Sequence, residues 1–94
     1  MALDPKTLTG AQLRAARGLA GISGEEIAER TQLGLSTIRR AEAEDGPVRM
    51  TRANTAALIT ALEGLGVQFL AADKSGGPGV RLALKGAAKR RATD

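Results

Sequence analysis

The chain has 94 residues and a formal net charge of +4, which suits a single domain. It contains no Cys, His, Tyr or Trp, so it lacks the residues of common zinc sites and of the usual nucleophile and general-base pairs. We therefore expect neither an enzyme nor a protein with a metal or other cofactor. No apolar run approaches the ~20 residues of a membrane helix, and the N-terminus lacks the apolar stretch of a signal peptide. A cytoplasmic protein is expected.

Large apolar side chains are scarce. Hydrophobic residues make up 43% of the chain, but 18 of them are Ala and the only aromatic residue is Phe69. Such a composition supports a small core, and small cores are often extended by association with a second copy.

The first predicted helix covers residues 9–20 and follows a flexible lead-in at residues 1–8. Thr9 is a suitable N-cap, because its hydroxyl can accept a hydrogen bond from a free amide of the first turn. Leu13 and Ala16 recur at helical spacing and are expected to face the core.

Residues 23–42 predict two short helices, at 24–31 and 35–45, joined by a tight turn at Gly34. Ser23 and Glu26 form the pattern of a capping box at the start of the first. The small residue at position 28 would let the two helices cross closely, as in a helix-turn-helix motif. The positions expected to face inward are Ile27, Ala28, Leu33, Ile38 and Ala41.

A fourth helix is predicted at residues 52–65, after a helix end at Gly46. Leu58, Leu62 and Leu65 recur four and three residues apart, which places them on one core-facing stripe.

Residues 67–71 and 80–84 instead alternate apolar and polar side chains, which predicts a β-hairpin with a glycine-rich loop. We expect a mostly α fold, with four helices and the hairpin in one domain over residues 9–84. The basic residues 85–94 are predicted to be a flexible tail.

The positive charge lies mainly outside the motif, because residues 23–46 hold three Arg against six carboxylates. These carboxylates are interpreted as helix-dipole and solvated-face charges, since no calcium-loop spacing surrounds them. They are Glu25, Glu26, Glu29, Glu42, Glu44 and Asp45.

Over residues 8–70 the chain resembles the XRE family of bacterial phage-repressor and Cro-like regulators. The resemblance rests on Ile27, Ala28, Leu33, the run Ser36-Thr37-Ile38, Arg40 and Glu42. The chain departs from the family pattern at Gln32, where Gly is usual, at Gly34, where a polar cap is common, and at Gly24, where Gln is common. The implied protein is a bacterial, nucleoid-associated regulator with a helix-turn-helix domain that binds double-stranded DNA.

The resemblance implies that residues 35–44 enter the major groove, which is about 12 Å wide and admits one helix. Arginine can bind guanine with two hydrogen bonds, hydroxyls can contact bases or phosphate, and Leu can meet a thymine methyl group. Contacts to bases are expected from Leu35, Ser36, Thr37, Arg39 and Arg40. Contacts to phosphates are expected from Ser23, Gly24, Arg49 and Arg52.

An alternative function uses the same fold as a protein-binding module, as in antiactivators and antitoxins of this family. The acidic motif, an apolar Leu35 on the groove-facing side and the missing polar residue at Gly24 favour it. The partner would then be a second regulatory protein.

A homodimer is also expected, because a two-stranded hairpin leaves an unpaired edge and is marginally stable alone. Leu70 would point away from the core face. Two copies joined through residues 67–84 would place their recognition helices about 34–36 Å apart, one turn of DNA. The predicted dimer interface consists of Val67, Phe69, Leu70, Val80 and Leu82, and Leu84 is expected to help cover the core.

Overall fold

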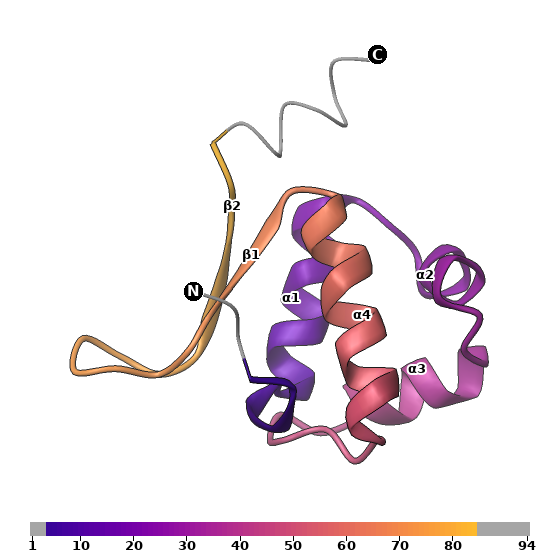
Figure 1. The fold of residues 1–94 in the computed structure, drawn as a ribbon, viewed down its shortest axis with the longest axis horizontal. Helices are drawn as coiled ribbons and strands as arrows, with labels where there is room; N and C mark the ends of the chain where they lie inside the picture. The colour runs from indigo at the N-terminus through magenta and orange to yellow at the C-terminus, as the bar shows by residue number, and fades with distance from the viewer. Residues whose placement is uncertain (1–3, 85–94) are drawn as a thin grey trace.

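The computed structural model describes residues 4–84 and confirms a mostly α domain of four helices followed by a C-terminal β-hairpin. Helices α1 and α4 lie side by side, α2 and α3 lie at one side of them, and the hairpin projects from the other (Figure 1). Each helix among these residues is too short or too polar to cross a membrane. The elements are η1 (Pro5–Thr7), α1 (Gly10–Ala20), α2 (Gly24–Thr31), α3 (Leu35–Glu42), α4 (Arg52–Gly64), β1 (Val67–Leu70) and β2 (Gly79–Leu82).

Three of the four helices begin at a hydroxyl residue whose side chain accepts a hydrogen bond from a first-turn amide. At α1 the capping box is complete: Gln12 N donates to Thr9 Oγ1 at 3.0 Å, and Thr9 N donates to Gln12 Oε1 at 2.9 Å. At α2 only half of the predicted box forms, because Ser23 accepts from Glu26 N while the Glu26 carboxylate pairs with an arginine one turn on. Thr51 caps α4 in the same way. These starts were predictable because all their partners are local.

The predicted range of α2 is confirmed, but the residue predicted to make the following turn and the predicted end of α3 are wrong. Gln32, with φ 62° and ψ 25°, makes the left-handed turn after α2, whereas Gly34 has φ −67° and serves as the N-cap of α3. The helix α3 ends at Glu42 instead of residue 45. It stops early because the chain turns toward α1, where the amide of Gly10 donates to the carbonyl of Gly46 at 2.9 Å. Gly46 is therefore not the C-cap.

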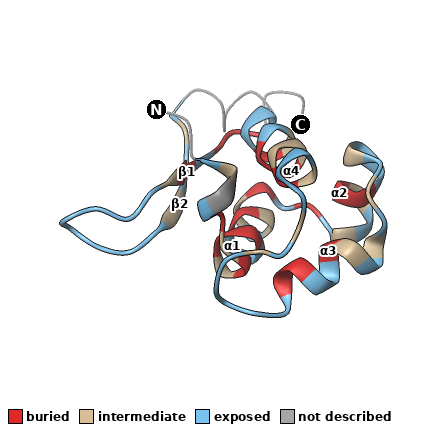
Figure 2. Ribbon diagram, turned by 60° about the horizontal axis from the view of Figure 1, so that its bottom comes forward, coloured by how far each residue is buried: buried red, intermediate tan, exposed pale blue. Residues whose placement is uncertain are grey.

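The core lies between α1, α4 and β1, and extends to the inner sides of α2 and α3 (Figure 2). The helix positions predicted to face inward are confirmed as buried, except that Leu33 is only partly covered. The buried apolar residues are Leu8, Leu13, Ala16, Ala20, Ile22, Ile27, Ala28, Ile38, Ala41, Leu58, Ile59, Leu62, Leu65, Val67 and Phe69.

The predicted lead-in is too long. Residues 5–7 form a short 3-10 helix, and Leu8 is fully buried. The carbonyl of Leu8 also accepts a hydrogen bond of 2.9 Å from the amide of Val48. The domain therefore includes the residues just before Thr9, because an apolar side chain there completes the core beside α4.

The hairpin pairs β1 and β2 in an antiparallel register with Val67 opposite Leu82 and Phe69 opposite Val80. The strands end at residues 70 and 82, slightly earlier than predicted. Leu84 is 97% exposed, so the expectation that it covers the core is wrong. A bond from Ala83 N to the carbonyl of Gly66 continues the same register by one pair. The ladder ends there because Leu65, the residue before Gly66, is already the C-cap of α4. The predicted tail at residues 85–94 lies outside the described residues.

Candidate nucleic-acid interface

Helix α3 has one buried side and one exposed side, and the buried side sets which residues face outward. Ile38 and Ala41 are 1% and 7% exposed and hold α3 against the core. Ser36, Arg39 and Arg40 are exposed as a result, and Thr37 is half-buried. In Figure 1 helix α2 is seen nearly end-on while α3 runs across the view, so α3 presents a free side at the lower edge of the domain.

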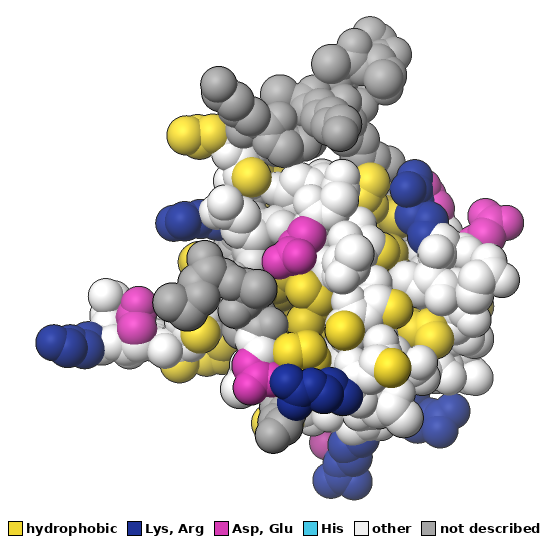
Figure 3. Space-filling model, in the orientation of Figure 1, with side chains coloured by type: hydrophobic (Ala, Val, Ile, Leu, Met, Phe, Trp, Pro, Cys, Tyr) yellow, Lys and Arg dark blue, Asp and Glu magenta, His cyan; other side chains and the backbone are white. Residues whose placement is uncertain are grey.

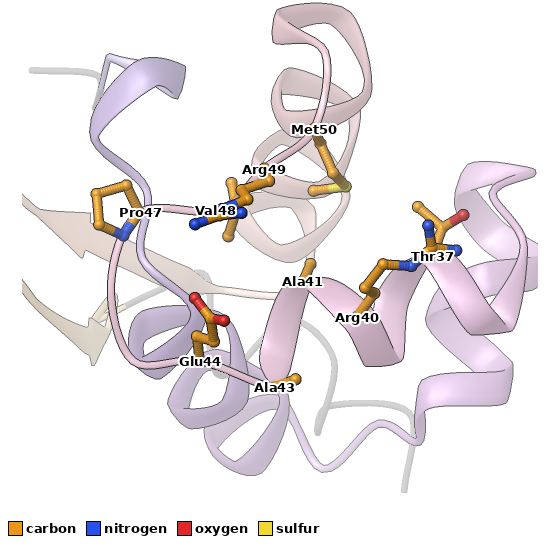
Figure 4. Close-up of a pocket in the computed structure, with 9 residues that line it drawn as sticks. All are labelled: Thr37, Arg40, Ala41, Ala43, Glu44, Pro47, Val48, Arg49 and Met50. Atoms are coloured by element: carbon orange, nitrogen blue, oxygen red, sulfur yellow. The ribbon is translucent and has the colours of Figure 1, made fainter.

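A hollow of about 220 Å³ lies between the C-terminal half of α3 and the connection to α4 (Figure 4). Thr37 and Arg40 line it from α3, and Arg49 lines it from the connection. Glu44 lines the end of the hollow farther from Thr37, and its carboxylate is opposite in charge to the two arginines. We call this feature the α3 hollow. Its residues are Thr37, Arg40, Ala41, Ala43, Glu44, Pro47, Val48, Arg49 and Met50.

The arginines around α3 differ in whether a carboxylate already neutralises them. Arg39 lies 3.8 Å from a carboxylate oxygen of Glu25 on α2, and Arg52 lies 3.6 Å from one of Asp4. Within residues 4–84, neither Arg40 nor Arg49 makes a side-chain hydrogen bond or an ion pair. Figure 3 shows basic side chains along the lower edge, where α3 lies. The structure therefore brings two uncompensated cations, Arg40 and Arg49, to one hollow.

Arg39 and Arg52 lie outside the α3 hollow. A DNA phosphate would have to compete with Glu25 for Arg39 and with Asp4 for Arg52. Both arginines remain more than half exposed, so these pairs are screened by solvent and weak.

The remaining predicted contacts lie at the start of α2 and are less suited to a phosphate. Ser23 caps α2, and its hydroxyl already accepts from the amide of Glu26. Two carboxylates, Glu25 and Glu26, occupy the first turn and would repel an anion. Leu35 is half-buried, packs on the core, and has a methyl group 3.3 Å from where a Cβ of Gly24 would lie. Leu35 thus faces α2, contrary to its predicted groove-facing position, and fills the space beside Gly24.

A partly buried ion pair fixes α3 on α1, and the sequence analysis missed it. Arg17 donates from Nε and Nη2 to the Glu42 carboxylate at 2.6 and 2.8 Å, and from Nη1 to the carbonyl of Ile22 at 3.1 Å. The side chain of Glu42 is only 10% exposed. The hydrogen bonds to Glu42 raise the pKa of the Arg17 guanidinium, and this outweighs desolvation, which lowers it.

A second arginine of α1 completes this attachment. Arg14 donates to the carbonyl of Glu42 at 2.5 Å and forms an ion pair with Asp45. A cation at the C-terminus of a helix is favourable, because it faces the negative end of the helix dipole. Glu42 therefore belongs to the attachment of α3 and is not the solvated charge that we predicted.

Gln12 is the second polar residue that the sequence analysis missed. It is 3% exposed, and its Nε2 donates to the carbonyls of Leu70 and Gly79, each at 3.1 Å. Gln12 therefore connects α1 to both strands of the hairpin. The spacing of Thr9 and Gln12 fits a capping box and was the available signal, but the contact with the hairpin is long-range.

Among residues 4–84, no three carboxylates gather in a group that could hold a metal ion. No family model matches the chain, and a search of curated proteins found no match.

Proposed function

We propose that the protein is a sequence-specific DNA-binding transcriptional regulator that places α3 in the major groove of double-stranded DNA. One observation carries the proposal: Arg40 and Arg49, neither with a carboxylate partner in the described chain, line the same hollow beside α3, Arg40 next to Thr37 and Arg49 on the opposite side (Figure 4). Uncompensated arginines next to a hydroxyl suit phosphates and the acceptors of guanine.

The proposed roles follow from position. Arg40 projects from the helix itself and reads a base edge, with Ser36 and Thr37 contacting bases or phosphate nearer the start of α3. Arg49 lies on the connection after α3 and binds the DNA backbone. Arg39 and Arg52 add phosphate contacts after leaving Glu25 and Asp4. Leu35, Ser23 and Gly24 are left out of this proposed contact surface, because of the packing and the carboxylates described above.

The experiment starts from a pool of random duplexes, because no operator is specified by the sequence. The full chain selects its preferred duplex, and binding is then measured at several salt concentrations for variants of exposed residues. Arg40→Ala should weaken binding to the selected duplex by about 1–3 kcal/mol and unrelated DNA much less. Arg49→Ala and Arg52→Ala should weaken all duplexes similarly, and each should reduce the salt slope by about one. The matched control is Lys74→Ala, which removes one positive charge from the exposed hairpin loop.

Two results contradict the proposal. Either no duplex is enriched, or Arg40→Ala loses no more affinity than Lys74→Ala while its circular dichroism spectrum stays unchanged.

A protein-binding function is the second candidate, and the acidic surface of α2 favours it. Glu25 and Glu29 are exposed there, and Glu25 neutralises Arg39 on the free side of α3. In that case a basic regulatory protein would bind across α2 and α3. Glu29→Lys separates the two functions, because it should weaken a complex with such a partner but strengthen non-specific DNA binding.

A further inference from the structure

Within the described part of the chain, the outer edge of β2 faces no other strand, and its backbone groups follow a fixed pattern. Ala83 N donates to Gly66 O at 2.7 Å, so the alternation of an antiparallel ladder turns the backbone groups of residues 79, 81 and 83 toward β1. Those of Val80 and Leu82 point the other way. Within residues 4–84 the sheet has only two strands, so these outward groups meet no third strand.

The same residues carry apolar side chains that the domain leaves partly or wholly uncovered. Val80 is half-buried against the core, Leu82 is 36% exposed and Leu84 is 97% exposed. Continued alternation places all three on one face of the sheet, the face that Val67 and Phe69 turn toward the helices. Leu82 and Leu84 are the exposed large hydrophobic residues of the described chain. An open edge and exposed leucines on the same strand indicate an incomplete sheet.

We propose that β2 pairs with β2 of a second copy of this chain, in an antiparallel register with Leu82 of each copy opposite Leu82 of the other. β2 would extend through Leu84, which then lies opposite Val80 of the second copy. The result is a four-stranded sheet with a two-fold axis at Leu82. The proposal is independent of DNA binding.

The pattern of β2 is what favours a second copy in this register. Val80 and Leu84 lie at equal distances from Leu82, so a two-fold axis there matches apolar residues with apolar residues on one face. The outward backbone groups of positions 80, 82 and 84 are all used. A register centred on Arg81 would instead place two arginines directly opposite each other, which is destabilising, and would leave Leu84 unpaired.

This interface differs from the predicted one. Val67 and Phe69 are 1% and 5% exposed, because they pack against the helices of their own copy, so they are not available to a partner. Leu70 is half-buried and its carbonyl already accepts from Gln12. The contact surface moves to Val80, Leu82 and Leu84.

Cysteine cross-linking tests the register directly, because the full chain has no cysteine of its own. In the proposed dimer the two Leu82 Cα atoms are about 5.5 Å apart, within the range of a disulfide. The two Arg81 Cα atoms are roughly 8 Å apart from strand spacing and rise, which is too far. Mild oxidation should therefore link Leu82→Cys into dimers and leave Arg81→Cys monomeric. Linking of Arg81→Cys with no linking of Leu82→Cys overturns the proposal.

The second measurement is the dimer dissociation constant of the full chain by analytical ultracentrifugation. We expect a species near twice the 9.7 kDa chain mass at micromolar concentration. Leu84→Lys should raise the dissociation constant at least tenfold, and its fold cannot suffer because Leu84 is almost fully exposed. The matched control is Thr60→Lys, which adds the same charge at an exposed position of α4.

A chain that stays monomeric at all accessible concentrations overturns the proposal. A dimer that Leu84→Lys and Thr60→Lys affect equally overturns it as well, because the contact must then lie elsewhere.

Discussion

The partly buried ion pair between Arg17 and Glu42 gives the sharpest stability prediction. The Glu42 side chain is 10% exposed and Arg17 is 26% exposed, so both groups have lost most of their water. Arg17→Met would leave a carboxylate buried without a counter-ion, and it would also remove the hydrogen bond to the carbonyl of Ile22. Breaking a fully buried pair costs about 3–5 kcal/mol, and this pair should lie at the lower end because Arg17 is only partly buried. A domain of this size is stable by roughly 5–14 kcal/mol, so the variant should lose a large fraction of its free energy of unfolding.

The double variant Arg17→Met/Glu42→Leu separates the value of the pair from the cost of an orphaned charge. It removes both charges and fills the same space with apolar atoms, which is often neutral or stabilising by about 1–4 kcal/mol relative to the intact pair. The double variant should therefore recover most of the loss. The matched surface control is Arg30→Ala, which breaks the exposed pair with Glu26 and should cost about 0.5 kcal/mol or less.

Urea unfolding followed by far-UV circular dichroism measures these effects, since the chain has no Trp or Tyr for fluorescence. The pKa of Arg17 is raised in the folded state, so its stabilising contribution is complete at neutral pH and is lost only in strong alkali. The difference between Arg17→Met and the unmodified chain should thus be constant around neutral pH. If Arg17→Met costs no more than Arg30→Ala, or the double variant is no more stable than the single one, the reasoning is wrong.

The remaining predictions concern backbone positions and use the same urea titration. Gly10→Ala would place a Cβ 1.9 Å from a carbonyl oxygen of residue 44, so it should cost about 1–3 kcal/mol or more. Gly18→Ala, in the same helix with nothing within 4 Å, should instead gain about 0.5–1 kcal/mol. Gln32→Gly should gain up to about 1 kcal/mol by relieving the left-handed conformation. A neutral Gly10→Ala would contradict the close approach of α1 to α3, and a destabilised Gln32→Gly would show that the side-chain bond to the Glu29 carbonyl outweighs the strain.

The sequence predicted what depends on neighbours along the chain. The caps at Thr9, Ser23 and Thr51 form with amides three residues away, and the core stripes of the helices follow from periodicity. The change to alternating residues after Gly66 likewise located the hairpin. The turn itself was predicted, but at Gly34. The residue that adopts the left-handed conformation is the one directly after α2, and in this chain that residue is Gln32 and not a glycine.

What the sequence could not show depends on contacts between distant residues. Arg17 and Glu42 are 25 residues apart, and charged residues are expected at the surface unless their partner is known. The candidate site also depends on contacts between distant residues. The resemblance to a known family was enough to predict that Arg40 and Arg49 contact DNA, but not which arginines are already paired. That neither arginine forms an ion pair within residues 4–84, in contrast to Arg39 and Arg52, became apparent only from the packing of α2 and of residue 4.

Helix α1 is attached to both proposed functional elements: Arg17 connects it to α3, and Gln12 connects it to the hairpin. The attachment of the hairpin through Gln12 can be tested alone. The oxygen of the Gln12 amide caps α1, while its nitrogen donates to the carbonyls of Leu70 and Gly79. Gln12→Glu keeps the capping acceptor but turns a second carboxylate oxygen toward those two carbonyls.

We therefore expect Gln12→Glu to lose at least as much stability as Gln12→Met, about 1–3 kcal/mol, although Gln12→Met also loses the cap. Burial next to carbonyl oxygens would raise the pKa of the new carboxyl group in the folded state. The folded state would then bind more protons than the unfolded state, so the stability of Gln12→Glu should increase as the pH falls toward that pKa. Hydrogen exchange should show the loss first in the amides of β1 and β2. A Gln12→Glu protein as stable as the unmodified chain at neutral pH would show that the hairpin is held by apolar packing alone.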